Sequence, residues 1–333
     1  MSLPPVEIPL GAMRFNSDSQ KLEYFNGQIW MQVHTFSPNL DGGARGLFHG
    51  GATSGVEGNT IDYITISSAG NAVDFGDTTD TQYEGSATSS NTRGLIVLGY
   101  ANPADVDTIE YVTMSSTGDA VDFGNLTSSK RVTCAFSNGT RGIFAGGYPH
   151  QNNIDYVTIA STGNAQDFGD TVWAGNYSTA NVASPTRGIK AGGRTTGPVA
   201  IINIIEYITT ATLGNSQDFG DCTSVIMFAA GVGNSTRGIW GGGQVPSNTD
   251  LIQKVEIATA GNSQEFGDLS GSRHGGGGAS SPTRGCFGGG RTPTLLDTIE
   301  YIAIATEGNA VDFGNLTVAR ASTAGFSNAH GGL

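Results

Sequence analysis

Residues 141–170 read RGIFAGGYPHQNNIDYVTIASTGNAQDFGD, and this stretch contains the features from which the fold is predicted. RGIFAGG, at 141–147, is a short apolar segment that ends in glycines, as a strand does where the chain turns or packs closely. IDYVTIA, at 154–160, alternates along its length, which is typical of a half-buried strand. Gly163-Asn164 then predicts a two-residue turn, after which AQDFGD, at 165–170, returns as the next strand.

The same pattern recurs through most of the chain. Arg-Gly followed by apolar residues and glycines marks each repeat, with the arginines at Arg45, Arg93, Arg141, Arg187, Arg237 and Arg284. An acid before Phe-Gly is the second mark, at Asp74, Asp122, Asp167, Asp218, Glu265 and Asp312. The steps of 46–50 residues between arginines fit one four-stranded propeller blade per repeat. The sequence therefore predicts an all-β chain with a six-bladed β-propeller over 39–333.

The two ends of this repeat region match in phase. Aligning Phe326-Ser327-Asn328 with Phe136-Ser137-Asn138 ends the chain where the first repeat begins, at Arg45. We expect a strand at about 318–328 to complete the sheet begun near residue 45, because a shared blade removes an open sheet edge.

Spacings within the repeats separate two faces. Only the stretch from the second glycine to the acidic strand position varies, from 8 to 13 residues, so one face carries fixed turns and the other carries variable loops. Loops on a rigid scaffold carry recognition, and aromatic side chains suit sugars or protein partners. The predicted interaction face therefore contains Tyr83, Tyr100, Tyr148, His150, Trp173 and Tyr177.

The repeated charged and aromatic residues have a structural and a functional interpretation. The six arginines are expected to pair with the acid before Phe, or with the Asp or Asn two residues after Phe; a cationic ring for phosphate or sulfate is the alternative. Asp-Phe-Gly has no kinase context here, and its Phe is expected to pack between blades. Lys130, Arg273 and Arg320 also share one repeat position.

Composition excludes several classes of function. A net charge of −13 disfavours nucleic acid, and no apolar run is long enough to insert in a membrane. The start of the chain does not resemble a signal peptide. Cys134, Cys222 and Cys286 are expected to be small core residues, and the scattered histidines predict no metal site. Asp105-Val106-Asp107 is read as a solvated acidic loop, with bound Ca²⁺ as the alternative. No catalytic motif or cofactor motif is present, so we expect no enzyme activity and no cofactor.

Residues 1–38 do not repeat. They contain short strand-like segments and Asn26-Gly27, a hairpin turn signal. A segment this short rarely folds alone, so we expect a small β module that docks on the propeller or on another chain.

The glycine doublet after one strand, the tyrosine-bearing strand and the aromatic of the last strand resemble kelch repeats over about residues 40–333, although kelch repeats usually have Trp where Phe stands here. This resemblance implies a propeller that binds protein or glycan. It does not imply the copper oxidase activity of some kelch-related enzymes.

The wording of the repeats, for example IDYVTIASTGNAQDFGD at 154–170, resembles virion proteins of tailed bacteriophages, notably phages of cyanobacteria. The segment Gly11–Trp30 is similar to parts of phage tail-fibre proteins. These resemblances imply a non-enzymatic virion surface protein, made in the host cytoplasm, whose residues 1–38 anchor it to other virion proteins. The variable face would then contact a host-surface glycan or receptor. A capsid-decoration or tail/neck protein without a receptor is the alternative, and the sequence leaves a homo-oligomer open.

Overall fold

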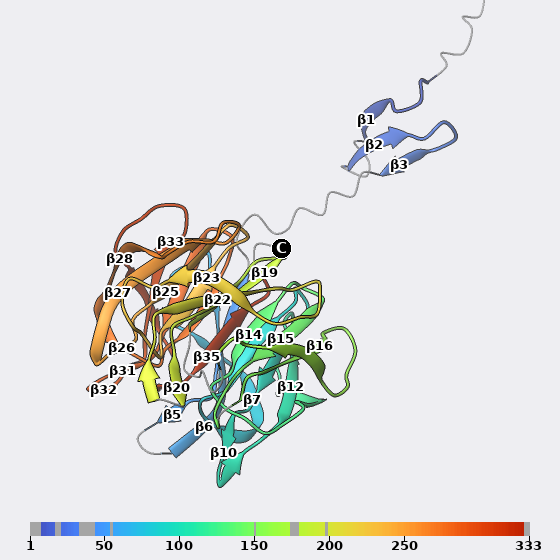
Figure 1. Cartoon of the computed structure of the whole chain (residues 1–333). Coiled ribbons are helices and arrows are strands. Elements are labelled where there is room, and N and C mark those ends of the chain that lie inside the picture. The colour runs from blue at the N-terminus through green and yellow to red at the C-terminus, as the bar shows by residue number, and fades with distance from the viewer. Residues whose placement is uncertain are drawn as a thin grey trace, which may run out of the picture. The chain divides into compact units, whose positions relative to one another are not determined.

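The computed structural model describes residues 8–16, 21–32, 44–53, 56–149, 151–173, 180–196 and 199–329. The chain divides into two compact units, residues 1–40 and 41–333 (Figure 1). Within the described ranges every regular element is a β-strand and none is a helix, which confirms the predicted all-β class.

The small unit is a three-stranded antiparallel sheet. Its strands are β1 (Met13–Asn16), β2 (Lys21–Phe25) and β3 (Trp30–Gln32), in that order across the sheet. The turn between β2 and β3 lies at the Asn26-Gly27 signal. Asn26 Oδ1 accepts hydrogen bonds from the backbone N–H groups of Gln28 and Ile29, at 3.0 and 2.9 Å. An Asn at the start of a turn favours this arrangement because its side chain bonds the backbone two residues on.

The described part of the larger unit contains six four-stranded antiparallel sheets, which we number 1 to 6 (Figure 1). In pairing order they are: sheet 1, β35 (Ala324–Ser327), β4 (Arg45–His49), β6 (Val56–Thr65) and β7 (Val73–Gln82); sheet 2, β8 (Ser86–Ser89), β9 (Arg93–Val97), β12 (Thr108–Thr113) and β13 (Val121–Asn125); sheet 3, β14 (Cys134–Ser137), β15 (Arg141–Ala145), β16 (Asn153–Thr158) and β17 (Gln166–Asp170); sheet 4, β18 (Ala180–Ala183), β19 (Arg187–Ala191), β22 (Ile204–Thr209) and β23 (Gln217–Asp221); sheet 5, β24 (Ala230–Gly233), β25 (Arg237–Gly241), β27 (Ser247–Glu256) and β28 (Gln264–Arg273); and sheet 6, β29 (Gly277–Ser280), β30 (Arg284–Gly288), β33 (Thr298–Ala303) and β34 (Val311–Asn315).

Short strands extend the loops between the second and third strands of five sheets. β5 (Ala52–Thr53) pairs with β6, and β26 (Gln244–Val245) pairs with β27. Three small hairpins are formed by β10 (Tyr100–Ala101) with β11 (Ala104–Asp105), β20 (Arg194–Thr196) with β21 (Val199–Ile201), and β31 (Arg291–Thr292) with β32 (Thr294–Leu295).

The end of the repeat region completes the sheet in which it began. β35 pairs with β4 in the register Ala324↔His49 to Ser327↔Gly46, as the phase match predicts. The first strands of the sheets contact one another in a cyclic order, β35 with β8, then β14, β18, β24 and β29, and β29 again with β35. The inner strands therefore share one centre, and each sheet has a neighbour on both sides.

The repeated arginines join each sheet to the next. Each Arg Nη1 donates to a main-chain carbonyl just after the third strand of the following sheet, and sheet 6 bonds to sheet 1. The pairs, with distances, are Arg45 to Met114 (3.1 Å), Arg93 to Ile159 (3.0 Å), Arg141 to Ala211 (3.0 Å), Arg187 to Ile257 (2.9 Å), Arg237 to Ile304 (2.9 Å) and Arg284 to Ser67 (2.9 Å).

The predicted arginine partners are therefore wrong. In five sheets the guanidinium lies over the tyrosine of the third strand, at 4.3–4.9 Å from the ring centroid. In sheet 5 that position is Lys254, and Arg237 pairs instead with Glu256. The acids before Phe are exposed, and within the described residues none of them has an ion-pair partner. Sequence spacing did not reveal that the aromatic face, rather than a carboxylate, lies beneath each arginine.

The Phe-Gly motif is explained by contact between neighbouring sheets. Phe75 is buried in a cluster with Ile61 of sheet 1 and Ile96 of sheet 2, and its ring meets Tyr63 edge to face at 6.0 Å. The following Gly76, with φ +147, leaves room for the next sheet, because a Cβ there would lie 2.5 Å from the backbone of Gly118.

The Gly-Asn turns pair with the outer strands. The predicted two-residue turn at Gly163-Asn164 is wrong, since β16 ends at Thr158 and residues 159–165 lead to β17. Gly163 N donates to Phe123 O in sheet 2, and Asn164 Oδ1 accepts from Asn125 N at 3.1 Å. The same side-chain bond recurs between every pair of neighbouring sheets, including sheets 6 and 1 through Asn71 and Asn315. Each turn therefore covers part of an edge that would otherwise be open.

The three cysteines lie in the core, as predicted. Cys134, Cys222 and Cys286 are buried and form no disulfide. Burial raises the pKa of the Cys222 and Cys286 thiols to about 12, so both remain protonated and unreactive at neutral pH.

Buried polar pairs tie the loop entering each sheet to its third strand. Arg320 pairs with Asp62 at 2.9 Å, Lys130 with Asp155 at 2.9 Å, and Arg273 with Glu300. These pairs give the shared repeat position of Lys130, Arg273 and Arg320 its structural explanation. In sheet 5 both partners are uncharged, because Ile226 and Gln253 occupy the two positions.

Sheet 2 departs from this rule at Glu110. Its side chain is buried, but the cation position is Gln82, which bonds His49 Nδ1 at 2.8 Å instead. Among the described residues, the Glu110 carboxyl is bonded by the Thr79 hydroxyl and backbone N–H, and by no cation. Burial raises the pKa of Glu110, and the Thr79 hydrogen bonds offset this only in part.

We expect Glu110→Gln to stabilise the protein at pH 7. A carboxyl whose pKa is raised by folding favours the folded state when protonated, and that contribution is lost as the pH rises from the unfolded pKa through the folded pKa. The variant removes this loss, so its advantage in unfolding free energy should shrink toward pH 4, below the ordinary glutamate pKa of about 4.3. Urea unfolding at pH 4 and pH 7 measures it. Glu300→Gln is the matched control, and should destabilise because it leaves Arg273 buried without a counter-ion.

Candidate functional site

The candidate site lies where the loops between sheets 1, 2 and 3 meet. In an antiparallel sheet alternate connections share one end, so the loops that lead into the next sheet lie beside those between second and third strands. Tyr83 precedes β8, Tyr100 begins β10, and Tyr148 follows β15. Backbone bridges join Tyr83 to Tyr100, and Arg131 to Tyr148. The structure therefore brings together three of the six residues predicted for the interaction face.

Arg131 is the centre of this cluster. Its guanidinium carbon lies 4.8 Å from the ring centroid of Tyr148, 5.1 Å from that of Tyr100 and 6.0 Å from that of Tyr83. The Tyr83 and Tyr100 rings are 5.1 Å apart. All four side chains are partly exposed. We call Arg131 with these three tyrosines and the two acids described next the Arg131 cluster.

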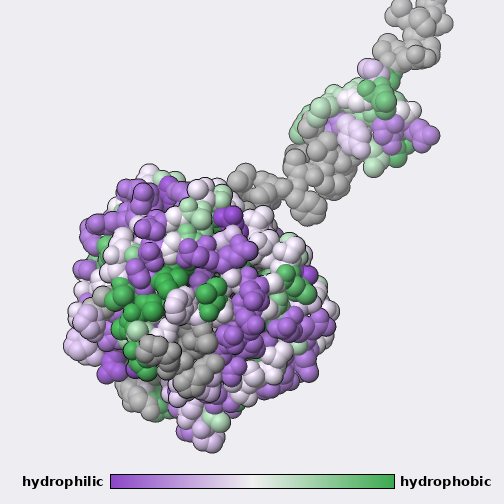
Figure 2. All heavy atoms as spheres, in the orientation of Figure 1, coloured by the Kyte–Doolittle hydropathy of each residue, from purple (hydrophilic) through white to green (hydrophobic). Residues whose placement is uncertain are grey.

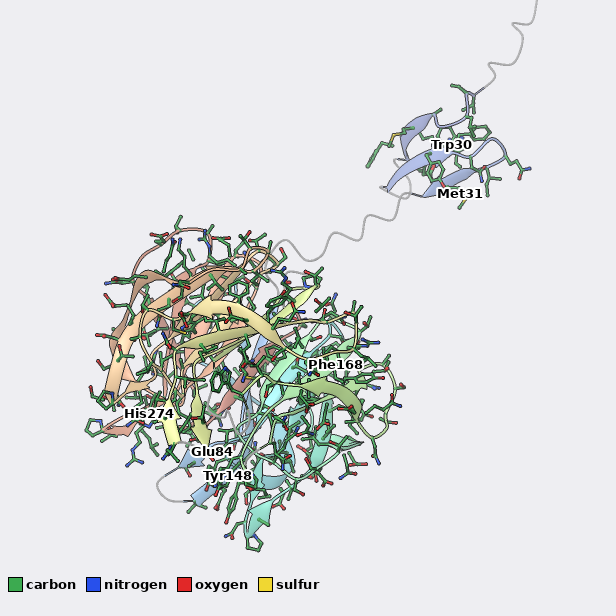
Figure 3. All side chains as sticks on the ribbon, viewed as in Figure 1. Trp30, Met31, Glu84, Tyr148, Phe168 and His274 are labelled. Atoms are coloured by element: carbon green, nitrogen blue, oxygen red, sulfur yellow. The ribbon has the colours of Figure 1, made fainter. Side chains whose placement is uncertain are left out.

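Two carboxylates complete the Arg131 cluster. Arg131 Nε lies 3.3 Å from Glu84 Oε2 and 3.5 Å from Asp105 Oδ1. Figure 3 labels Glu84 and Tyr148, which lie close together on the larger unit. Burial raises the pKa of Glu84 and of Asp105, and Arg131 opposes the shift in both. At neutral pH the cluster has one cation and two acids, held among rings that can stack on a ligand.

The acidic loop at 105–107 has protein partners. Asp105 faces Arg131, and Asp107 Oδ1 accepts a hydrogen bond from Asn125 Nδ2 at 3.0 Å. Across the described ranges, no three His, Cys, Asp or Glu side chains are grouped so as to hold a metal ion.

The other predicted site residues do not join the Arg131 cluster in the structure. Trp173 follows β17 and is 45% exposed, beside the exposed Val172. His150 and Tyr177 lie outside the described residues.

A belt of backbone hydrogen bonds adjoins the Arg131 cluster. The residue after each loop's Tyr83-like position has a left-handed backbone, at Glu84, Val132, Phe228, Gly275 and Ser322, with φ from +52 to +70. In this belt Gly275 N donates to Phe228 O, Ser322 N to Gly275 O, Glu84 N to Ser322 O, and Val132 N to Glu84 O, at 2.7–3.1 Å. The belt surrounds one end of a cavity of about 100 Å³ between the inner strands. Glu84 thus belongs to the belt by its backbone and to the Arg131 cluster by its side chain.

Arg131 was missed by sequence reasoning. It follows Lys130, whose repeat position was noted, and its own position is occupied by Tyr83, Arg131, Met227, His274 and Ala321 in different repeats. Large and variable residues at one repeat position are the signal that could have identified it.

No protein-family model and no curated protein matches this chain. Within the described part of the chain, no helix is long and apolar enough to cross a membrane.

Proposed function

We propose that this protein is a non-enzymatic surface-recognition protein of a tailed-bacteriophage virion, which binds a host-surface glycan through the Arg131 cluster. The single observation that carries the proposal is the gathering of three partly exposed tyrosines around Arg131, with two carboxylates, at loop ends on a rigid scaffold. Tyrosine rings suit the apolar faces of sugars, and charged groups beside them suit hydroxyls.

The scaffold we propose is a six-bladed kelch-like β-propeller in which sheets 1 to 6 are the blades. The pairing of β35 with β4, the cyclic order of the inner strands and the arginine bonds from every sheet to the next all support it. Such a scaffold keeps loops from different repeats in constant positions, as a recognition surface requires.

Replacing Arg131 with Gln, or Tyr148 with Ala, should weaken attachment to host cells by about tenfold or more, because central aromatic and arginine contacts dominate binding energy. Attachment of the purified protein to host cells, titrated by flow cytometry, measures this. Asn91→Ala is the matched control, since Asn91 is exposed on a fixed turn at the opposite end of sheet 2. Full attachment by a variant with Ala at Tyr100, Tyr148 and Trp173 would show that another surface binds.

The proposal assigns residues 1–38 to attachment on other virion proteins, on the resemblance of Gly11–Trp30 to tail-fibre segments. Deleting 1–38 should abolish incorporation into particles and leave the larger unit folded, because the two units have separate contacts. Immunoblots of purified particles, with circular dichroism of the truncated protein, test this. Truncated protein found on particles at the full-length level would contradict the anchoring role.

One observation favours a second candidate function, a structural capsid-decoration or tail/neck protein without a receptor. Arg131 already has two carboxylates and three rings as partners, so the cluster also serves as a connection between sheets 1, 2 and 3. Cryo-electron microscopy of intact particles separates the two functions: a position at a fibre tip favours recognition, and a position on the capsid lattice or neck favours the structural role.

A further inference from the structure

One face of the small unit's sheet consists of apolar and aromatic side chains. Met13 is directly opposite Tyr24, and Tyr24 is directly opposite Met31, so the three side chains share a face. Phe15 shares this face because it is two residues from Met13 on the same strand. These side chains are 62%, 40%, 38% and 67% exposed, in the order Met13, Tyr24, Met31, Phe15. Hydrophobic residues are accordingly seen at the surface of this unit (Figure 2). We call these four residues the apolar face.

The opposite face of the sheet has its own partners. Arg14 pairs with Glu23 at 2.8 Å and lies over the Trp30 ring at 4.2 Å. Asn16 Nδ2 donates to Glu23 at 2.9 Å, and the Phe25 and Trp30 rings are 5.5 Å apart. Charged groups and aromatic rings therefore stabilise one another on this side, while the apolar face contacts only solvent within the described part of the unit.

A sheet of three short strands needs a second layer to be stable in water. Units near 40 residues usually obtain the missing stability from disulfides, metals or association. Residues 1–40 contain no cysteine, and the described residues hold no metal cluster. Association is the remaining source, and exposed apolar patches of this kind mark association surfaces.

We propose that the apolar face binds the same face of a second copy of this chain. The face has no charged side chain, so two copies can meet there without repulsion, although each chain has a net charge of −13. An isologous contact needs a patch that is complementary to itself, and an uncharged apolar row meets that condition. Tyr24, on the central strand, would lie nearest the twofold axis, with Met13 and Met31 on either side.

This contact would give each assembly two larger units, independently of what they recognise. Two linked binding modules gain avidity without any new contact to the ligand, which matters most for weak binding.

The test is the mass of the full-length protein in solution, by sedimentation equilibrium at about 100 µM, where a dimer with a micromolar Kd is populated. We expect twice the chain mass of 34.3 kDa. Phe15→Lys should return the protein to the single-chain mass at the same concentration. Val121→Lys is the matched control, because Val121 is similarly exposed on β13 of the larger unit and the change in charge is the same. This control should leave the mass unchanged.

A second measurement keeps the test valid if Phe15→Lys unfolds the small unit. Tyr24→Cys should form a disulfide between copies under mild oxidation, whereas Gln28→Cys, in the exposed turn, should not; the native cysteines are buried. A wild-type protein of single-chain mass, a dimer that survives Phe15→Lys, or equal cross-linking of both cysteine variants would each overturn the proposal.

Discussion

Replacing Gly278 with Val is expected to prevent stable folding of the larger unit, at a cost of at least about 3 kcal/mol. Gly278 lies on β29, one of the six inner strands, and a Cβ there would lie 2.0 Å from the carbonyl oxygen of Gly231 on β24. The neighbouring glycines make the same close approach, Gly231 to Asn181 and Gly325 to Gly278. No single strand can move aside, because each inner strand is held by its own sheet and by both neighbours.

Thermal unfolding followed by circular dichroism measures this effect. Gly271→Ala is the control, because a Cβ at Gly271 meets no atom within 4 Å, and we expect its melting temperature to stay close to wild type. A Gly278→Val protein that melts like the control would mean that the inner strands are further apart than the structure has them.

Replacing Asp62 with Gln is expected to cost about 3–5 kcal/mol, because Arg320 would be left buried without a counter-ion. Asp62 accepts from Arg320 Nη2 at 2.9 Å and from the Thr317 hydroxyl at 2.6 Å. Arg320 also donates to the carbonyl of Phe48 at 3.1 Å. These bonds attach the segment before β35 to β4 and β6, so their loss weakens the place where the two ends of the larger unit meet. Equilibrium urea unfolding gives the change in free energy.

A double variant tests the cause. Asp62→Gln with Arg320→Ile copies the uncharged pair found in sheet 5, Gln253 with Ile226. Replacing both ions removes the unpaired buried charge, and we expect the double variant to be more stable than either single variant. If the losses of the two single variants simply add, the buried charge is not the source of the cost.

The repeat allowed much of the fold to be predicted. Strand positions in sheet 3 follow the alternation at 154–160, and β35 lies within the segment expected to meet residue 45. Partners of the repeated side chains were predicted less well. Acids such as Asp74 stand at regular spacing from the arginines, yet they are exposed, whereas Tyr63 lies under Arg45. Spacing reports a position along the chain but not which side chain of a neighbouring strand lies beneath it.

The candidate site was predicted in part for a similar reason. Loop length and aromatic content pointed to Tyr83, Tyr100 and Tyr148, which the structure brings together. Arg131, which joins them, stands in a segment leading from sheet 2 to sheet 3, and its reach to loops of two earlier repeats has no periodic signal. Glu84 was missed as well, because its left-handed backbone is held by the belt rather than by its own residue type.

The sequence by itself determined the all-β class, the six repeats, the strand alternation and the meeting of the two ends, because each follows from a period that is visible along the chain. Only the tertiary structure decided that arginines contact rings and carbonyls of neighbouring strands and sheets, that Glu110 is buried without a cation, and that Arg131 gathers three tyrosines. These are contacts between residues tens to hundreds of positions apart, and their geometry depends on how neighbouring sheets pack.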